Sequence, residues 1–285
     1  MKLIANGPGI GDSVFLTSVA HWYHLEFPNE PIDIVAKHKA LFINNPDINS
    51  VNENWTTAGF PELHNQASIK EHNVQVMLRK LGVKNIPKWE EIRQYLYVED
   101  LPSTVNNGDS YITFQVKAGD WTKNKNWSIH NWFDLIAKIY WDLGIDVYQV
   151  GDIKEEHVNE AYNDDYGQWM GRPLSEVASF IQRAKLHICP VSGTMHIASG
   201  VGTKSVVIYG GREDPKITGY ANNRNIETDS YRLKNHIRQE KSCNPCWKVE
   251  DCPYGWYSQQ EFLKPCTQLI SVEDVFNEVK RCLSF

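Results

Sequence analysis

The strongest constraint on the fold is the alternation of short apolar segments with longer amphipathic segments along the chain. The apolar segments predict strands at residues 2–5, 32–35, 94–98, 111–116, 146–150, 186–189 and 205–209. The amphipathic segments predict helices at residues 13–27, 37–43, 71–81, 132–143, 174–183, 192–199 and 274–282. Between them, residues 7–12 predict a tight loop. This alternation is typical of an α/β protein with parallel sheets.

The segment 101–109 is rich in turn-forming residues and poor in apolar ones, which marks a domain boundary. With 285 residues, the chain is long enough for two domains of ordinary size. We therefore expect a Rossmann-like domain over residues 1–105, a second over residues 106–285, and a cleft between them.

The composition is that of a soluble globular protein, with 41% hydrophobic and 22% charged residues. The net charge of −6 argues against a nucleic-acid partner, although a local basic patch could still bind phosphate. The amino-terminal sequence has no signal-peptide pattern, and no apolar run approaches the roughly 20 residues that span a bilayer. These observations predict a cytoplasmic protein.

The segment from residue 186 to residue 211 predicts an anion site. An apolar strand ends at Pro190, Ser192 is placed to cap the next helix, and Gly193 allows close approach of the backbone. The free N–H groups at a helix start, together with the helix dipole, would bind a diphosphate. His196 lies one turn from Ser192 and could face the same ligand. The alternatives are an ordinary strand-to-helix turn and a structural histidine.

The sequence of residues 189–215 resembles the donor-site segment of the ADP-heptose:lipopolysaccharide heptosyltransferase family, glycosyltransferase family 9. Further motifs of that family follow in the same order over nearly the whole chain. They are Gly11-Asp12 after the first strand, Lys125-Asn126-Trp127 near the start of the second half, Gly151 with Glu155, and Cys243-Asn244-Pro245-Cys246.

The resemblance implies a GT-B fold, in which two Rossmann-like domains face a cleft, with the donor in the second domain and the acceptor mainly in the first. It implies an inverting transfer of a sugar from a nucleotide-diphosphate donor. Asp12 would be the general base that removes the proton of the acceptor hydroxyl, and Gly9 and Gly11, which precede it, would belong to the acceptor loop. The alternative for Asp12 is a helix cap.

The donor would be bound by several residues that match the family's motifs. Hydrogen bonds to the phosphates would come from Ser192, Gly193 and Thr194, and His196 would lie beside them. Lys125 would neutralise the leaving diphosphate, and Lys117 and Lys123 are rival candidates for this cation. At the nucleoside end, Gly151 would lie beside Glu155, which would accept from the ribose hydroxyls. A surface carboxylate is the alternative for Glu155.

One departure from the family's pattern concerns the donor sugar. Val191 stands where the family usually has an acidic residue before Ser/Thr-Gly, and that residue lies at the sugar in the family. An ADP-sugar is the favoured donor and a glycan is the favoured acceptor. The identity of the transferred sugar stays open. Peripheral contact with a membrane also stays open. Two alternative functions stay open: an inactive protein that binds nucleotides or glycans, and a nucleotide-sugar epimerase.

A late cluster of cysteines has spacing that suits a metal. Its members are Cys243, Cys246, Cys252 and Cys266, and four thiolates could hold zinc or a single iron in a structural role. Similar autotransporter heptosyltransferases use cysteines to hold iron. The alternative is a loop of reduced thiols. Catalysis by this family requires no cofactor. Cys189 and Cys282, on a predicted strand and helix, are expected in the core.

Overall fold

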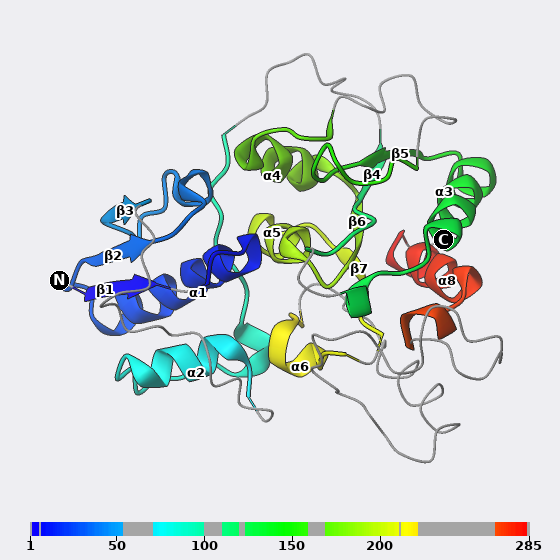
Figure 1. The fold of residues 1–285 in the computed structure, drawn as a ribbon. Coiled ribbons are helices and arrows are strands. Elements are labelled where there is room, and N and C mark those ends of the chain that lie inside the picture. Colours follow the sequence, from blue (N-terminus) through cyan, green and yellow to red (C-terminus); the bar gives the residue numbers. More distant parts are fainter. Residues whose placement is uncertain are drawn as a thin grey trace.

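The computed structural model describes residues 2–5, 7–53, 71–99, 110–119, 123–158, 169–210, 212–221 and 266–283. Within these residues the chain forms two separate parallel sheets with helices around them (Figure 1). The predicted α/β class is therefore confirmed. The predicted boundary near residue 105 lies outside the described residues and stays a prediction.

The first sheet has three parallel strands in the order β1 (Lys2–Ala5), β2 (Ile32–Val35) and β3 (Ser50–Asn52). The long helix α1 (Ile10–Glu26) connects β1 to β2. A 3-10 helix (Lys39–Phe42) precedes β3, and the amphipathic α2 (Asn73–Lys80) packs on α1.

The second sheet has four parallel strands in the order β5 (Asp146–Gln149), β4 (Tyr111–Phe114), β6 (Leu186–Pro190) and β7 (Ser205–Ile208). Its helices are α3 (Ile129–Leu143), α4 (Leu174–Arg183), α5 (Gly193–Val201), the short α6 (Pro215–Thr218) and α8 (Val272–Leu283). A 3-10 turn (Trp89–Glu91) precedes the sheet in sequence, and two others (Lys123–Lys125 and Cys266–Leu269) precede α3 and α8.

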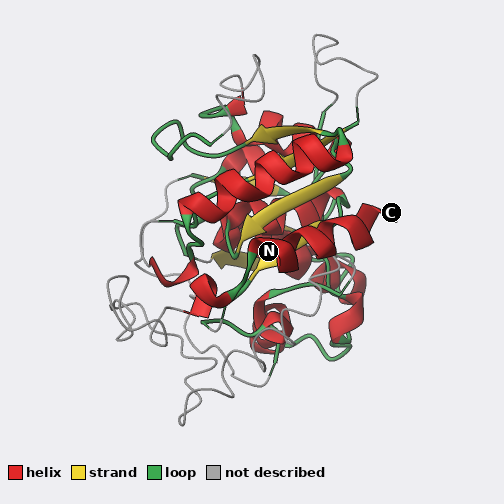
Figure 2. Cartoon of the chain, turned by 90° about the vertical axis from the view of Figure 1, so that its right-hand side faces the viewer, coloured by secondary structure: helices red, strands yellow, loops and turns green. Residues whose placement is uncertain are grey.

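Alternating side chains of the second sheet bury against different layers. Ile188 of β6 and Val206 of β7 pack in the core with α3 and α8, whereas Cys189 and Val207 face the core with α4 and α5. Figure 2, seen from the side of α3 and α8, shows these two helices in front of the strands. Strand order reverses at β4, because β5 lies on one side and β6 on the other. In open α/β sheets such a switch point is where ligands bind, at the carboxyl ends of the strands.

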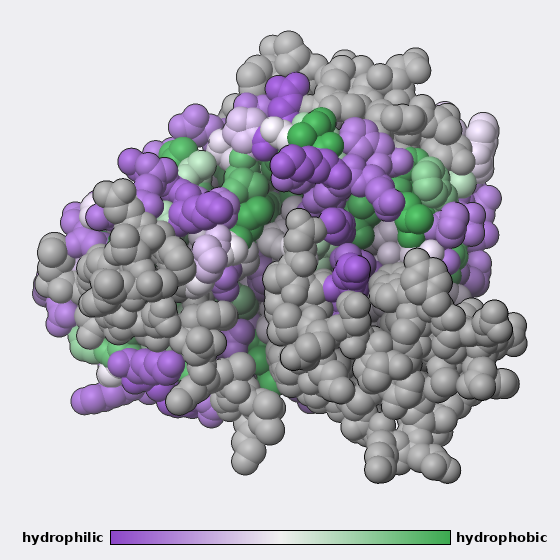
Figure 3. Space-filling view, viewed as in Figure 1, coloured by the Kyte–Doolittle hydropathy of each residue, from purple (hydrophilic) through white to green (hydrophobic). Residues whose placement is uncertain are grey.

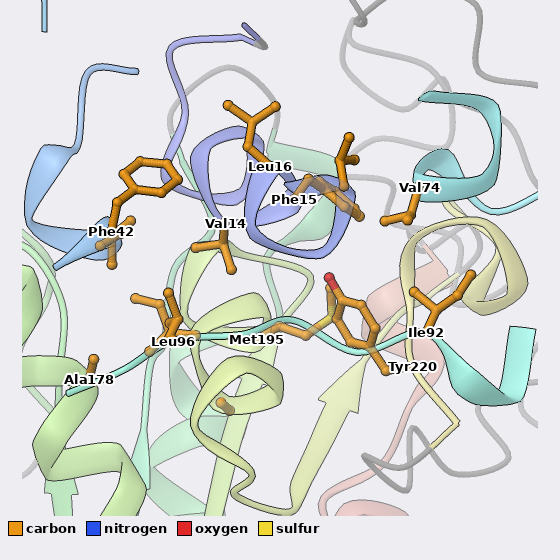
Figure 4. Close-up of a cluster of buried hydrophobic side chains, with 14 of the residues drawn as sticks. Val14, Phe15, Leu16, Phe42, Val74, Ile92, Leu96, Ala178, Met195 and Tyr220 are labelled. Atoms are coloured by element: carbon orange, nitrogen blue, oxygen red, sulfur yellow. The ribbon is translucent and has the colours of Figure 1, made fainter. Parts of the chain in front are cut away.

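One continuous core joins the two sheets. It contains Val14 and Phe15 of α1, Val74 of α2, Ala178 of α4 and Met195 of α5. Figure 4 shows these side chains converging between the helices, with α1 directly across from α5. Because the helix that follows β1 packs on the helix that follows β6, the carboxyl edges of the two sheets are brought toward each other.

The segment 94–98, predicted as a strand, is not a strand. Its side chains alternate between buried and more exposed, with Gln94 and Leu96 buried, which explains the strand-like sequence pattern. The segment packs beside α5 and does not pair with a strand. The Leu96 N–H donates a hydrogen bond to the Gly200 carbonyl of α5 at 3.2 Å. The segment therefore has an inward face, but none of the strands in the described residues pairs with it.

Most other predicted elements are confirmed within a few residues, but two details of the sequence analysis are wrong. Residues 10–12 belong to α1 and not to a loop, because Gly9 occupies the N-cap position. The 3-10 helix at residues 39–42 replaces the helix predicted there.

Cys189 and Cys282 are buried, as predicted for core cysteines. Within the described part of the chain, no helix combines the length and apolar character needed to cross a membrane. The described surface in Figure 3 is mainly hydrophilic, with hydrophobic residues in smaller patches.

Candidate functional site

The starts of α1 and α5 meet, and glycines make the contact possible. A Cβ atom on Gly11 would lie 2.7 Å from Cδ2 of His196, and a Cβ atom on Gly193 would lie 2.7 Å from Cβ of Ile10. Any larger side chain at either position would push the helices apart. The first N–H groups of both helices, with their positive dipole ends, therefore lie in one small region.

Asp12 stands at the third position of α1, in this region. Its Oδ2 atom accepts a hydrogen bond from the Gly9 N–H at 3.0 Å, so the carboxylate folds back over the helix start. It also packs on Gly7, where a Cβ atom would collide with the carboxylate. The side chain is only partly buried and interacts electrostatically with His38 and Lys125. The local helix-capping role and a role toward a ligand are compatible in this geometry.

Lys125 lies in a buried ionic cluster beside Asp12. Its Nζ atom is 2.5 Å from Oε1 of Glu213, and the Arg212 guanidinium contacts the same oxygen. Burial lowers the pKa of Lys125, while the Glu213 carboxylate opposes that shift. Lys125 also acts electrostatically on His196 of α5, which places its charge near the start of that helix.

The hydroxyls at the start of α5 are fixed from behind by Gln115, the residue that follows β4. Ser192 and Thr194 both donate to Oε1 of Gln115, at 2.8 and 2.7 Å. Ser192 is the N-cap residue as predicted, but the predicted side-chain cap is wrong, because its hydroxyl bonds to Gln115 instead of the helix N–H groups. Gln115 and Ser192 stand at the carboxyl ends of β4 and β6, on either side of the switch point.

A buried histidine extends this hydrogen-bonded network into the sheet. His187 Nε2 lies 2.9 Å from the Thr194 hydroxyl and Nδ1 lies 3.0 Å from the Thr113 hydroxyl. Since Thr194 donates to Gln115, its oxygen accepts from Nε2–H, and Nδ1 accepts from Thr113. Burial lowers the pKa of His187 to about 3, in keeping with this neutral form.

Glu155 is linked to the same network on its other side. Its Oε1 atom accepts from the Gln115 side chain at 3.0 Å and from the Asp152 N–H at 3.1 Å. Gly151 has φ of 152° and packs directly on the carboxylate, where a Cβ atom would collide with it. Oε2 is buried and has no hydrogen-bond partner among the described residues. Burial raises the pKa of Glu155, and Lys117 acts electrostatically on it in the opposite sense.

His196 is held at the contact between the helices. Its Nδ1 atom lies 2.5 Å from the Tyr220 hydroxyl, and its ring packs against Phe15 of α1. The Gln94 amide donates to Tyr220 at 3.0 Å and accepts from Thr17 of α1 at 3.2 Å, so a polar chain joins the two halves. Burial lowers the pKa of His196 to about 3, so the ring is neutral.

The structure therefore brings most of the predicted site residues to one edge of the second sheet and the adjoining start of α1. The predicted residues found there are Gly9, Gly11, Asp12, Lys125, Gly151, Glu155, Ser192, Gly193, Thr194 and His196. Of the rival cations, Lys123 is exposed and Lys117 lies toward Glu155. The roles of all these residues toward a ligand stay predictions.

The predicted metal cluster falls largely outside the described residues. Cys243, Cys246 and Cys252 are not among them, and Cys266 is half-buried at the start of a 3-10 helix. In the described ranges, no three His, Cys, Asp or Glu side chains are grouped as metal ligands would be.

Three further residues at this edge, Gln115, Arg212 and Glu213, are not predicted from the sequence. Each has a signal that could have revealed it: Gln115 is a polar residue at the end of an apolar strand, and the Arg212–Glu213 pair follows the glycines after β7. Polar and charged residues at the carboxyl ends of parallel strands are placed for ligands.

Two parallel α/β units with a polar site where they meet form a GT-B fold, and solved glycosyltransferase structures share this fold. The family model of glycosyltransferase family 9 (heptosyltransferase) matches residues 59–248. The chain belongs to this family and is a glycosyltransferase. A search of curated proteins by sequence found no match.

Several solved structures share the fold at low sequence identity. The glycosyltransferase family 9 protein of Veillonella parvula is 15% identical, with a TM-score of 0.66 over 99% of this chain and 97% of that one. The iron-containing dodecameric glycosyltransferase TibC of enterotoxigenic Escherichia coli is 16% identical, with a TM-score of 0.68 over 99% and 78%. Escherichia coli ADP-heptose lipopolysaccharide heptosyltransferase II is 16% identical, with a TM-score of 0.56 over 77% and 87%.

Proposed function

We propose that the protein transfers a sugar from an ADP-sugar, with ADP-heptose as the first candidate, to a hydroxyl group of a glycan, with inversion at the anomeric carbon. The observation that carries the proposal is the meeting of Asp12 with the start of α5 and with Lys125. In such a transfer a carboxylate can act as general base, helix N–H groups can bind the diphosphate, and a cation can stabilise the leaving group. Family membership supports the reaction type.

The donor nucleotide is proposed to bind at the carboxyl edge of the second sheet. The N–H groups at the start of α5 would hold the diphosphate, with Ser192 and Thr194 fixed in place by Gln115. Glu155 would accept from the ribose hydroxyls through Oε2, since Oε1 is already occupied. TibC, which shares the fold, has been solved in complex with ADP-D-beta-D-heptose.

In the proposed reaction the Asp12 carboxylate takes the proton of the acceptor hydroxyl as its oxygen attacks the anomeric carbon. The bond from that carbon to the diphosphate oxygen breaks, and the diphosphate leaves with the electron pair. The helix dipole of α5 and the Lys125 ammonium stabilise the charge that develops on the leaving group. Asp12 lies on α1, so the acceptor would be bound by the first half of the chain.

Val191 is the reason to test the donor sugar directly. It is 3% exposed and apolar, so it supplies no hydrogen-bonding side chain at the position where the family usually has an acidic residue. The proposed phosphate contacts would be independent of this side chain, because backbone N–H groups would make them. Val191 therefore bears on the identity of the donor sugar and leaves the diphosphate site unaffected. The alternative function that Val191 favours is a protein that binds the nucleotide without turnover.

The test is a binding screen against ADP, UDP, GDP and dTDP and their sugars, followed by transfer assays. A ligand at 100 times its Kd should stabilise the fold by about 2.7 kcal/mol, which a thermal shift detects. We expect ADP and an ADP-sugar to give the largest shift. Absence of a shift with every nucleoside diphosphate would refute the donor site. Binding without release of free ADP from an ADP-sugar, in the presence of glycan acceptors, would support the alternative.

A further inference from the structure

Tyr220 lies at the contact between the two halves of the protein, where its hydroxyl takes part in two hydrogen bonds. The side chain is 0% exposed. Its oxygen lies 2.5 Å from Nδ1 of His196 on α5 and accepts from the Gln94 amide at 3.0 Å. Gln94 in turn accepts from Thr17 of α1 at 3.2 Å. All four side chains are buried, and together they form one polar chain from α1 to α5.

The rings around Tyr220 come from both halves. The His72 ring at the start of α2 lies 5.7 Å from the Tyr220 ring between centroids, and the His196 ring of α5 lies at 5.6 Å. Figure 4 shows the Tyr220 hydroxyl directed toward α1. The tyrosine is therefore packed between elements of the first half and of the second.

Such a chain fixes the alignment of two packed helices more sharply than apolar contacts do. Hydrogen bonds weaken steeply away from their preferred distance and angle, and a buried polar group that loses its partner costs free energy. Apolar cores, in contrast, tolerate repacking when total volume is kept. The contact between α1 and α5 is otherwise largely apolar. The polar chain therefore selects one alignment among those that apolar packing would allow.

The chain ends on the imidazole that contacts the start of α1. A Cβ atom on Gly11 would lie 2.7 Å from Cδ2 of His196, and Gly11 directly precedes Asp12. His196 itself stands in the first turn of α5, the helix whose start is the proposed diphosphate site. The placement of the His196 ring therefore bears directly on the separation between the proposed base and the proposed leaving group.

We propose that Tyr220 is a positioning residue for the transfer reaction. By holding the His196 imidazole against α1, it sets the separation between the Asp12 carboxylate and the donor bound at α5. Gln94 holds Tyr220 from the opposite side, so loss of either residue has the same effect on the reaction. A misplacement of about 1 Å can lower a reaction rate by about 10²-fold. This inference rests on the proposed function, since it requires transfer from a donor bound at α5.

The test is Tyr220→Phe, which removes only the hydroxyl. Turnover is measured as release of ADP from ADP-heptose with a lipopolysaccharide core oligosaccharide as acceptor, and the Kd for ADP is measured on the same preparation. We expect kcat to fall about 10- to 100-fold. The Kd for ADP should change by less than about threefold, because the N–H groups at the start of α5 and the support from Gln115 do not involve Tyr220.

Tyr209→Phe is the matched control, because it also removes one hydroxyl from a tyrosine that is 0% exposed. The Tyr209 hydroxyl donates to Sδ of Met195 on α5 at 3.3 Å, so this bond stays within the second half. The control variant should lose some stability and keep kcat within about twofold of the wild type. Melting temperatures show that each variant is folded. Equal losses of kcat in the two folded tyrosine variants would overturn the inference.

Gln94→Met tests the chain at the member beyond Tyr220. It should lower kcat to a similar extent with little change in the Kd for ADP. Combined with Tyr220→Phe it should be less than additive, because both changes break the same chain. An increase in the Kd for ADP as large as the loss of kcat would show that the chain supports the donor site alone, and would overturn the inference.

The outcomes for the inference and for the proposed function are distinct. If the wild type turns over normally and folded Tyr220→Phe matches it, the inference fails and the proposed function is untouched. If the wild type releases no ADP from any ADP-sugar, the proposed function fails and the inference fails with it.

Discussion

Gly11 of α1 and His196 of α5 are in contact across the two halves of the protein, with no room for a methyl group between them. A Cβ atom on Gly11 would lie 2.7 Å from Cδ2 of the histidine and 3.1 Å from its Nε2. The contact sets the separation between the helix that carries Asp12 and the helix that would hold the donor diphosphate. The contact would allow the proposed general base on α1 and the proposed phosphate site on α5 to act on the same pair of substrates.

Substituting Gly11 by alanine tests this spacing. Gly11 lies in the first turn of α1, where helix propensity alone would favour alanine by about 1 kcal/mol. The clash with His196 should outweigh that gain, so we expect a net loss of about 1–3 kcal/mol in the free energy of unfolding and a marked loss of transfer activity. Urea denaturation and initial rates measure the two effects.

A double-mutant cycle with His196→Ala is the control for the Gly11 variant. Truncating the imidazole removes the group that the new methyl would strike, so the two changes should be less than additive. Strict additivity would show that the helices adjust without strain.

Asp12→Asn should abolish transfer while leaving the donor site intact. The amide retains an oxygen that can accept from the Gly9 N–H, so the start of α1 should persist. Loss of a general base typically lowers kcat by about 10²–10⁴-fold. Transfer rates and ADP affinity are to be measured on the same preparation. Equal turnover by wild type and variant would remove Asp12 from the reaction.

Gln115→Leu should weaken donor binding indirectly, because Gln115 holds other residues of the proposed donor site in place. The change leaves the Ser192 and Thr194 hydroxyls without the Gln115 acceptor and removes one of the two donors to Glu155, at a cost of about 1–3 kcal/mol in stability. ADP should lose affinity, and 2′-deoxy-ADP should lose less, because Glu155 would no longer be aimed at the ribose. Isothermal titration with both nucleotides measures this difference.

Gln75→Leu is the matched control for that experiment. Gln75 donates to the Pro87 carbonyl at 2.8 Å beside α2, so its loss should reduce stability without altering nucleotide affinity. If the two glutamine variants affect ADP binding equally, Gln115 has no special role at the donor site.

Three buried histidines should make the fold sensitive to acid. Burial lowers the pKa of His72, His187 and His196 from 6.5 to about 3. Because these pKa values lie below those of the unfolded chain, the native state binds fewer protons. Stability is therefore full above pH 6.5 and declines as the pH falls from 6.5 toward 3, by up to about 1.4 kcal/mol per pH unit for each histidine.

Chemical denaturation between pH 7 and about pH 4 measures this dependence. His187→Asn, which can still bond to Thr113 and Thr194, should reduce proton uptake on unfolding by about one. An identical pH dependence in the wild type and this variant would show that His187 is not the neutral buried group that its surroundings indicate.

The cysteine cluster predicts about one structural zinc or iron per chain. Elemental analysis of protein purified without added metal should detect it, and the variant with Cys243 and Cys246 both changed to serine should lose it. A metal content near zero in the wild type refutes the prediction. TibC, which shares the fold, is an iron-containing protein.

The sequence was sufficient for the elements whose periodicity and end signals agree. Helix α3 ends at Gly144, which adopts the left-handed conformation expected of a glycine after a helix, with φ of 63°. Strand β6 and helix α5 were predicted within two residues at each end. Such features depend on neighbours in sequence, so local patterns reveal them.

The segment 94–98 shows where local patterns mislead. The alternating burial, with Gln94 and Leu96 inside, has the period of a strand, yet no strand in the described part of the chain pairs with this segment. The same limit applies to Ser192, whose position predicts a cap but whose hydroxyl bonds to Gln115, 77 residues away in sequence. Which polar partner a side chain finds depends on packing between segments far apart in the chain.

By itself the sequence determined the α/β class, the strand-to-helix turn at Ser192–Gly193 and the presence of a carboxylate near the start of α1. Only the tertiary structure showed how Asp12 and Lys125 come close to the start of α5. That result depends on α1 packing against α5 with glycines at the contact, and on Glu213 gathering two buried cations at the edge of the sheet. These are contacts between distant segments, and the free energy that selects them comes from burial and charge pairing over the whole fold.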